Sequence, residues 1–158
     1  MKYLLSLMLM CSICFGQTFT STNIGGGCPL VGETLPIVPL VEYAPRMNTL
    51  NIGISDTFGG WVGSVLIIDF SNRPIRMFPT PLPMSWVGLP YSCQIMVEPW
   101  YIHIFASNGV FDPSGDVATL QVPWGIPPNY DFIVQFLIVD GNSPIGFCFS
   151  DAVRGLLR

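Results

Sequence analysis

Apolar and polar positions alternate along much of this chain, and no stretch repeats with the period of a helix. The alternation is cleanest in residues 47–55 and in residues 91–98. Successive side chains of a β-strand point to opposite faces, so a period of two predicts half-buried strands there. Residues 61–70 and 132–139 are apolar on both faces, which is typical of a central strand in a covered sheet.

The C-terminal part, residues 131–157, predicts a long antiparallel hairpin. Two apolar runs flank the sequence DGNSP at residues 140–144. Gly and Asn tolerate a positive φ and Pro ends ladder bonding, so the chain is expected to reverse at this point. We expect this hairpin to close the fold.

Turn-forming residues are spread over the whole chain. There are 16 Gly and 15 Pro, while only 10% of the residues are charged and 50% are hydrophobic. Turn signals recur roughly every 8 to 15 residues, which favours many short strands over long helices. A chain of 158 residues fits one domain. We predict an all-β fold, a single antiparallel β-sandwich of about eight strands, immunoglobulin-like or jelly-roll-like.

Residues 1–16 have the form of a secretory signal peptide. A short basic start, Met1-Lys2, precedes an apolar run over residues 3–15 that is too short to span a bilayer. Gly16 suits cleavage before Gln17. The alternative, a lipoprotein signal, needs small residues just ahead of a cysteine, and these fit badly here. We therefore expect a secreted or periplasmic protein without a transmembrane segment in the mature chain.

The predicted division of the chain follows from this leader. After the signal peptide at 1–16, residues 17–27 are rich in Thr, Ser and Gly and are interpreted as a flexible lead-in. The β-sandwich domain is then expected to occupy residues 28–158.

Three cysteines follow the leader, and in an oxidising compartment two of them are expected to pair. We favour Cys28–Cys93, which would tie the entry of the domain to the sheet and add about 2–4 kcal/mol by restricting the unfolded chain. Cys148 lies on a face of small residues and fits a buried thiol. The spacing alone leaves the other pairings open.

The charge balance argues against two classes of partner. The formal net charge is −4, and the six basic residues form no stripe. Nucleic-acid binding depends on Lys and Arg that neutralise phosphates, so we predict no nucleic-acid partner. An anionic membrane surface is disfavoured for the same reason.

The sequence offers little for catalysis, metals or cofactors. His103 is the only histidine, and its place on a predicted strand favours a structural residue over a catalytic one. Asp112 and Asp116 could approach Ca²⁺, but the segment lacks the further ligands of a calcium loop and is interpreted as a turn. Zinc and nucleotide motifs are missing from the sequence. We predict no enzyme activity, no metal site and no cofactor.

Tryptophans supply the remaining candidate chemistry. Trp86, Trp100 and Trp124 lie near strand ends or in Pro-rich segments. Exposed indoles can stack on sugar rings, which would make the protein a carbohydrate-binding module. The competing interpretation, which we favour, is that these bulky aromatics close the ends of the core.

Four short motifs together resemble a known group of proteins. They are GGGCP at residues 25–29, GLPYSC at 88–93, DPSGD at 112–116, and LIVDGNSPIGFCFSDAVRG at 137–155. This set resembles the uncharacterised secreted β-sandwich domains common in planctomycete-type bacteria, over residues 28–157. The Pro-rich segment 72–89 departs from their pattern. The resemblance supports Cys28 and Cys93 as partners and implies no established activity.

These observations favour a secreted or envelope-associated, non-catalytic module with a structural, adhesive or interaction role. Its expected partner is a protein or a polysaccharide at the cell surface. The alternative is the carbohydrate-binding module that uses exposed tryptophans. A small hydrolase that depends on His103 is a third, weaker hypothesis.

Overall fold

The structure is a computed structural model of the 158-residue chain. The residues that it describes are 18–29, 32, 34–54, 61–70, 80–89, 93–98, 101–106, 116–121, 130–141, 143 and 145–158. The predicted signal peptide, residues 1–16, lies outside them.

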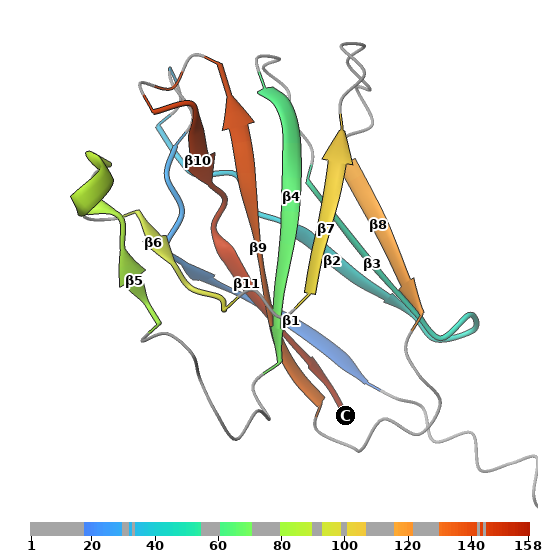
Figure 1. Ribbon diagram of the computed structural model, residues 1–158. Coiled ribbons are helices and arrows are strands. Elements are labelled where there is room, and N and C mark those ends of the chain that lie inside the picture. The colour runs from blue at the N-terminus through green and yellow to red at the C-terminus, as the bar shows by residue number, and fades with distance from the viewer. Residues whose placement is uncertain are drawn as a thin grey trace, which may run out of the picture.

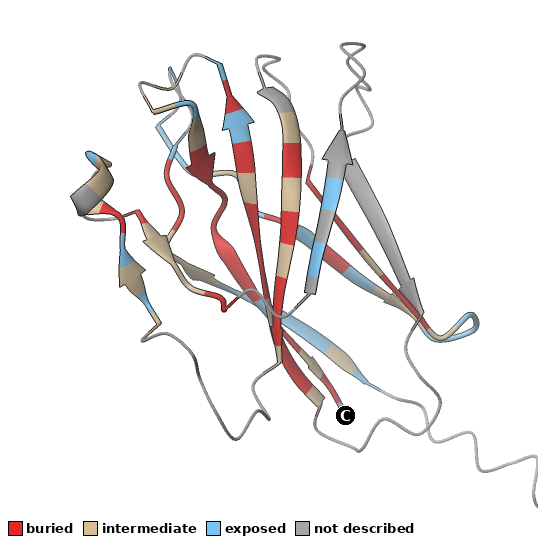
Figure 2. Cartoon of the chain, in the orientation of Figure 1, coloured by how far each residue is buried: buried red, intermediate tan, exposed pale blue. Residues whose placement is uncertain are grey.

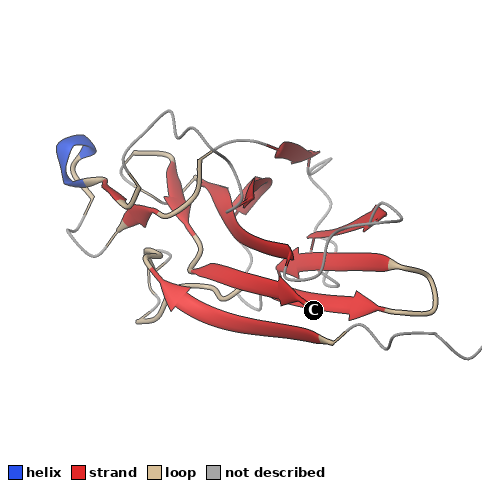
Figure 3. Cartoon of the chain, turned by 90° about the horizontal axis from the view of Figure 1, so that it is seen from below, coloured by secondary structure: helices blue, strands red, loops and turns tan. Residues whose placement is uncertain are grey.

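The described chain consists of β-strands joined by turns, with one short 3₁₀ helix, η1 (Ser85–Val87). The strands are β1 (Phe19–Gly25), β2 (Leu40–Ala44), β3 (Thr49–Ile54), β4 (Trp61–Phe70), β5 (Leu82–Pro83), β6 (Gln94–Ile95), β7 (Tyr101–Ala106), β8 (Asp116–Gln121), β9 (Tyr130–Asp140), β10 (Phe147–Phe149) and β11 (Ala152–Leu157). Figure 3 shows this strand content, with the helical turn at one end of the molecule. The predicted all-β class is confirmed.

The strands form two main antiparallel sheets (Figure 1). The large sheet has the order β1-β11-β9-β4-β7, with β10 also paired to β9, and the small sheet has the order β2-β3-β8. A separate pair, β5 with β6, completes the described strands. The eleven strands exceed the predicted number of about eight because β5, β6 and β10 span only two or three residues each, too few for an alternating pattern to show.

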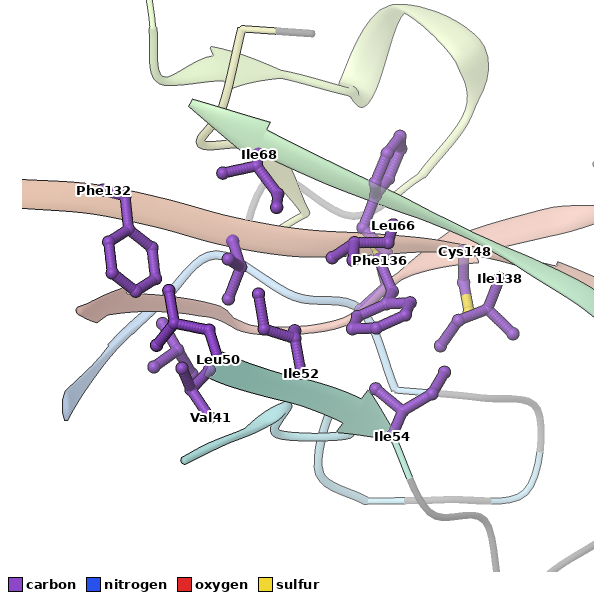
Figure 4. Packing of buried hydrophobic residues seen from close by; sticks show 14 of the residues in the cluster. Val41, Leu50, Ile52, Ile54, Leu66, Ile68, Phe132, Phe136, Ile138 and Cys148 are labelled. Atoms are coloured by element: carbon purple, nitrogen blue, oxygen red, sulfur yellow. The ribbon is translucent and has the colours of Figure 1, made fainter. Parts of the chain in front are cut away.

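The main core lies between the two sheets, as expected for a sandwich. Figure 4 shows apolar side chains of β2 and β3 facing those of the large sheet. The buried residues from the small sheet are Val41, Leu50, Ile52 and Ile54, and those from the large sheet include Leu66, Ile68, Phe132, Phe136 and Ile138. Alternate residues of β4 and β9 therefore point inward, and the residues between them form an outer face.

The C-terminal hairpin exists, but it is broken in the middle. β9 pairs first with β10, with Phe149 opposite Leu137, and then with β11, with Val153 opposite Val134. Between these two pairs, residues 150–152 of the returning strand lie against residues 135–136 of β9. The returning strand therefore holds one extra residue, a β-bulge. The bulge lies at Ser150 and neighbouring residues, between the two short strands.

Two segments differ from the sequence interpretation. Residues 19–25, expected in a flexible lead-in, form β1 and pair antiparallel with β11 at the edge of the large sheet. Of residues 91–98, expected as one alternating strand, the structure describes 93–98, and within these only the short β6 is a strand. The backbone of Gln94 and Met96 bonds instead to Gly26 and to the side chain of Gln135.

Candidate interaction surface

The outer face of the large sheet is apolar and only partly covered. Ile102 and Ile104 of β7 are 54% and 70% exposed, and Val139 of β9 is 38% exposed. Figure 2 shows the pale-blue, exposed positions along β7 and near the end of β9. Exposed isoleucines side by side on a strand are unusual in a monomer, because each leaves apolar area in water.

The neighbouring strands extend this apolar surface. Val65 of β4 lies opposite Ile104, and Ile67 lies opposite Ile102. Across β4, Leu137 of β9 lies opposite Val65, and these three neighbours are half-buried. We call this set the β7 patch: Ile102, Ile104 and Val139 with Val65, Ile67 and Leu137. It arises because β4 and β9 are apolar on both faces while the core takes only one of them.

The other half of the outer face is covered by an arm, residues 80–89 and 93–98, which carries β5, η1 and β6. The arm lies beside β10, toward the edge of the sheet that is far from β7 (Figure 1). Met84 and Cys93 of the arm are buried, and so is Phe149 of β10. The arm therefore shields apolar surface that would otherwise continue the β7 patch.

A buried amide holds the arm on the sheet. Gln135 has no exposed surface although it occupies an outward position of β9. Its Oε1 accepts a hydrogen bond from the Met96 N–H (2.9 Å), and its Nε2 donates to the carbonyls of Gln94 (2.9 Å) and Ser150 (3.0 Å). A buried amide with three bonds satisfies its own polar atoms and also the backbone of the arm.

The bulge carries a second polar cluster. The Ser150 Oγ accepts a bond from the Phe136 N–H (2.9 Å) and donates to the Asp151 carbonyl. The Asp151 carboxylate accepts bonds from the Gly27 N–H (2.9 Å) and from the Asn23 Nδ2 (2.8 Å). The extra residue of the bulge thus turns polar groups toward the N-terminal segment and fixes it.

Gly27 is required at this contact. A Cβ at Gly27 would lie 2.4 Å from the backbone N of Asp151 and 2.6 Å from the carbonyl carbon of Ser150. These are rigid backbone atoms, so a larger residue would separate the segment from the bulge.

The disulfide joins the same two segments. Cys28 and Cys93 are bonded, with their Cα atoms 4.9 Å apart, as the sequence analysis favoured. The Cys28 N–H donates to the Phe149 carbonyl, and the Gln94 N–H donates to the Gly26 carbonyl. The N-terminal segment, the arm and β10 are therefore linked at one place, covalently and by hydrogen bonds.

Cys148 is a free, buried thiol on the core side of β10, next to Ile138 (Figure 4). Burial, with a contribution from the Asp140 carboxylate, raises its pKa to about 12. The thiolate is the nucleophilic form, so this cysteine is unreactive at neutral pH.

The predicted tryptophan site can be located only in part. The backbone of Trp86 belongs to η1 in the arm, while Trp100 and Trp124 lie outside the described residues. His103 is placed by its backbone in β7, and Asp116 begins β8. Asp112 lies outside the described residues. Within the described part of the chain, no three His, Cys, Asp or Glu residues gather as a metal site would require.

Sequence reasoning missed the polar residues that position the arm. Gln135 was visible as a polar residue within an apolar strand, which is the signal of a buried, bonded amide. The same signal marked Ser150 and Asp151 after the apolar run of β10. Apart from the adjacent Asp151 carbonyl that Ser150 binds, their partners are 14 to 128 residues away in the chain, so the pattern alone could not name them.

Comparisons with known proteins do not place the chain in a family. No protein-family model matches it, and no curated protein is similar to it. The resemblance to planctomycete domains stays a prediction. In the described residues, no helix has the length and apolar character to span a membrane.

Proposed function

We propose that this protein is a secreted or envelope-associated, non-catalytic β-sandwich that works as an adhesive or interaction module. Its contact surface is the β7 patch. The observation that supports this proposal is the exposure of Ile102 and Ile104, at 54% and 70%, in register with the half-buried Val65 and Ile67 of β4. Contact with a partner would remove this apolar area from water.

Two further features support the same surface. The fold provides a rigid platform, because β4 lies between β7 and β9 and pairs with both along most of its length. The arm leaves the β7 half of the outer face open while it covers the other half. The predicted signal peptide would deliver the domain to a compartment where partners on the cell surface are available.

The proposal is tested by binding of labelled mature protein to cell-envelope fractions of the producing organism. Ile104→Lys places a charge in the β7 patch, and Leu40→Lys is the matched control, since Leu40 is 61% exposed on β2 of the other sheet. We expect saturable binding that Ile104→Lys weakens about tenfold, which corresponds to about 1.4 kcal/mol. Leu40→Lys should bind as the unmodified protein does. Equal binding by the two variants would overturn the proposal.

The same assay with a panel of polysaccharides addresses the alternative. Saturable binding to one glycan class that is lost in Trp100→Ala and unchanged in Ile104→Lys would favour the carbohydrate-binding module instead. A quench or blue shift of tryptophan fluorescence on binding would accompany that outcome.

A further inference from the structure

Among the described strands, β7 is an edge strand whose own residues lack the protective features found at the edges of β1, β2 and β8. Within the described residues, it pairs with β4 alone. β1 has a register shift between Asn23 and Gly25, β2 follows Pro39 and exposes Glu42, and β8 begins with Asp116. Bulges, prolines and carboxylates are the usual means by which an edge avoids pairing with another chain. The sequence of β7, YIHIFA, contains none of these.

We propose, building on the proposed function, that a second copy of this chain adds its own β7 as an antiparallel strand at the β7 edge, so that the β7 patches of the two copies join into one apolar surface. The two large sheets would then form one continuous sheet about a twofold axis, an isologous contact. Strand addition at an open edge supplies main-chain hydrogen bonds, and the alternate side chains supply the specificity.

Charge favours a second copy at this edge. The chain is acidic, with a formal net charge of −4 and ten carboxylates, so two copies repel wherever their carboxylates meet. β7 has no acidic residue, and neither have the β4 and β9 residues of the β7 patch. Two copies can therefore approach at this edge without bringing negatively charged side chains of β7 against each other.

The pairing register follows from the strand period. Residues opposite each other in an antiparallel pair lie on the same face, so their numbers must add to an even value if the exposed faces are to stay continuous. A register centred on His103 places Ile102 of each copy opposite Ile104 of the other. Both isoleucines then form cross-strand apolar pairs, the arrangement that stabilises neighbouring strands.

The size of the contact predicts its strength. Six residues form an edge roughly 20 Å long, and a strand edge with its side chains is about 10 Å high, so each copy contributes on the order of 200 Å². A stable interface buries about 800 Å² per partner. The dimer is therefore weak and concentration-dependent, with a dissociation constant on the order of 100 μM.

Sedimentation velocity on the mature, oxidised protein, from about 10 μM to about 1 mM, tests the association. The average mass should rise toward that of a dimer. Ile104→Lys should remain a monomer over the whole range, and the control Leu40→Lys should associate as the unmodified protein does. Near-ultraviolet circular dichroism confirms that both variants are folded. A protein that stays monomeric at the highest concentration, or association that Ile104→Lys leaves unchanged, would overturn the inference.

Cysteine cross-linking tests the register. A mixture of Ile102→Cys and Ile104→Cys proteins should form a disulfide-linked dimer under mild oxidation, because the two thiols lie directly opposite each other on the paired strands. Each variant alone should cross-link several-fold less. Cys148 does not compete, since it is buried. Equal yields from the mixture and from either variant alone would overturn the register.

The two proposals can fail separately. A monomer at all concentrations, together with cell-envelope binding that Ile104→Lys weakens, would reject the second copy as partner and leave the proposed function intact. Self-association without envelope binding would support the inference and contradict the adhesive role.

Discussion

The two halves of the outer face of the large sheet are built from the same strands and end in opposite states. One half lies under the arm, and the other is the β7 patch, open to solvent. The register Ile102–Ile67–Gln135 runs directly from one half to the other. The two halves differ in the side chains that a covering segment could contact. Gln135 supplies an amide that bonds to backbone, whereas Ile102 and Ile104 supply only apolar area. An apolar strand face is covered specifically where a polar group fixes the cover.

Loss of the disulfide should have the largest effect on this contrast. In the double variant Cys28→Ser/Cys93→Ser, the free energy of unfolding should be lower by about 2–5 kcal/mol, because the disulfide no longer restricts the unfolded chain. Urea denaturation measures the change, and Cys148→Ser, which keeps the disulfide, is the control for loss of a buried thiol. An unchanged midpoint in the double variant would mean that hydrogen bonds alone hold the arm.

Replacement of the buried amide should have the next effect. Gln135→Leu leaves the Met96 N–H and the Gln94 carbonyl without their partner, at a cost of about 2–3 kcal/mol. Hydrogen exchange at the Met96 amide should accelerate more than exchange in the centre of β9. Gln94→Ala keeps the carbonyl that Gln135 binds and should leave the Met96 amide protected. If exchange is the same in both variants, Gln135 does not hold the arm.

A side chain at Gly27 should weaken the attachment of the N-terminal segment. Gly27→Ala places a Cβ against the backbone at Asp151 and Ser150, and such overpacking costs about 1–3 kcal/mol. Gly25→Ala tests the strain of a positive φ without that clash, because a Cβ at Gly25 meets no atom within 4 Å. Thermal unfolding of the two variants separates the effects. A Gly27→Ala variant as stable as the unmodified protein would contradict the close contact at Gly27.

The smallest effect is expected on the open half. Ile104→Lys should change the free energy of unfolding by no more than about 0.5 kcal/mol, because the side chain is already 70% exposed and packs against little. Chemical denaturation of dilute protein measures this value. A loss of several kcal/mol would show that the β7 patch belongs to the core of the fold and is not a free surface.

The central strands could be predicted from the sequence, but the segments that cover the sheet could not. β3, β4 and β9 could be predicted because each carries its burial pattern within a few consecutive residues. The turn after Asp140 was equally local, and there the Asp140 carbonyl accepts a bond from the Ser143 N–H. β1 could not be predicted, since four of its residues are exposed and polar and its position depends on pairing with β11, more than 120 residues away.

The candidate surface could likewise be predicted only in part from the sequence. The apolar character of β4 and β9 on both faces predicted central strands in a sheet that is covered on at least one side. The position of the arm, which decides where cover is missing, depends on the long-range bonds of Gln135 and Asp151. Ile102 and Ile104 had the appearance of ordinary strand residues, since exposure is a property of what packs against a residue and is not encoded in the residue itself.

The bulge in the C-terminal hairpin also changes which residues, even-numbered or odd-numbered, point to the core. Before it, even-numbered residues such as Cys148 point to the core, and after it, odd-numbered residues such as Val153 and Leu157 do so. The bulge thus accommodates one extra residue without turning β11 over. Deletion of a single residue there would restore regular pairing, with Val153 still opposite Val134 and Arg154 still on the outer face. Deletion of two residues would, with regular pairing, place Val153 opposite Gln135 and turn Arg154 toward the core.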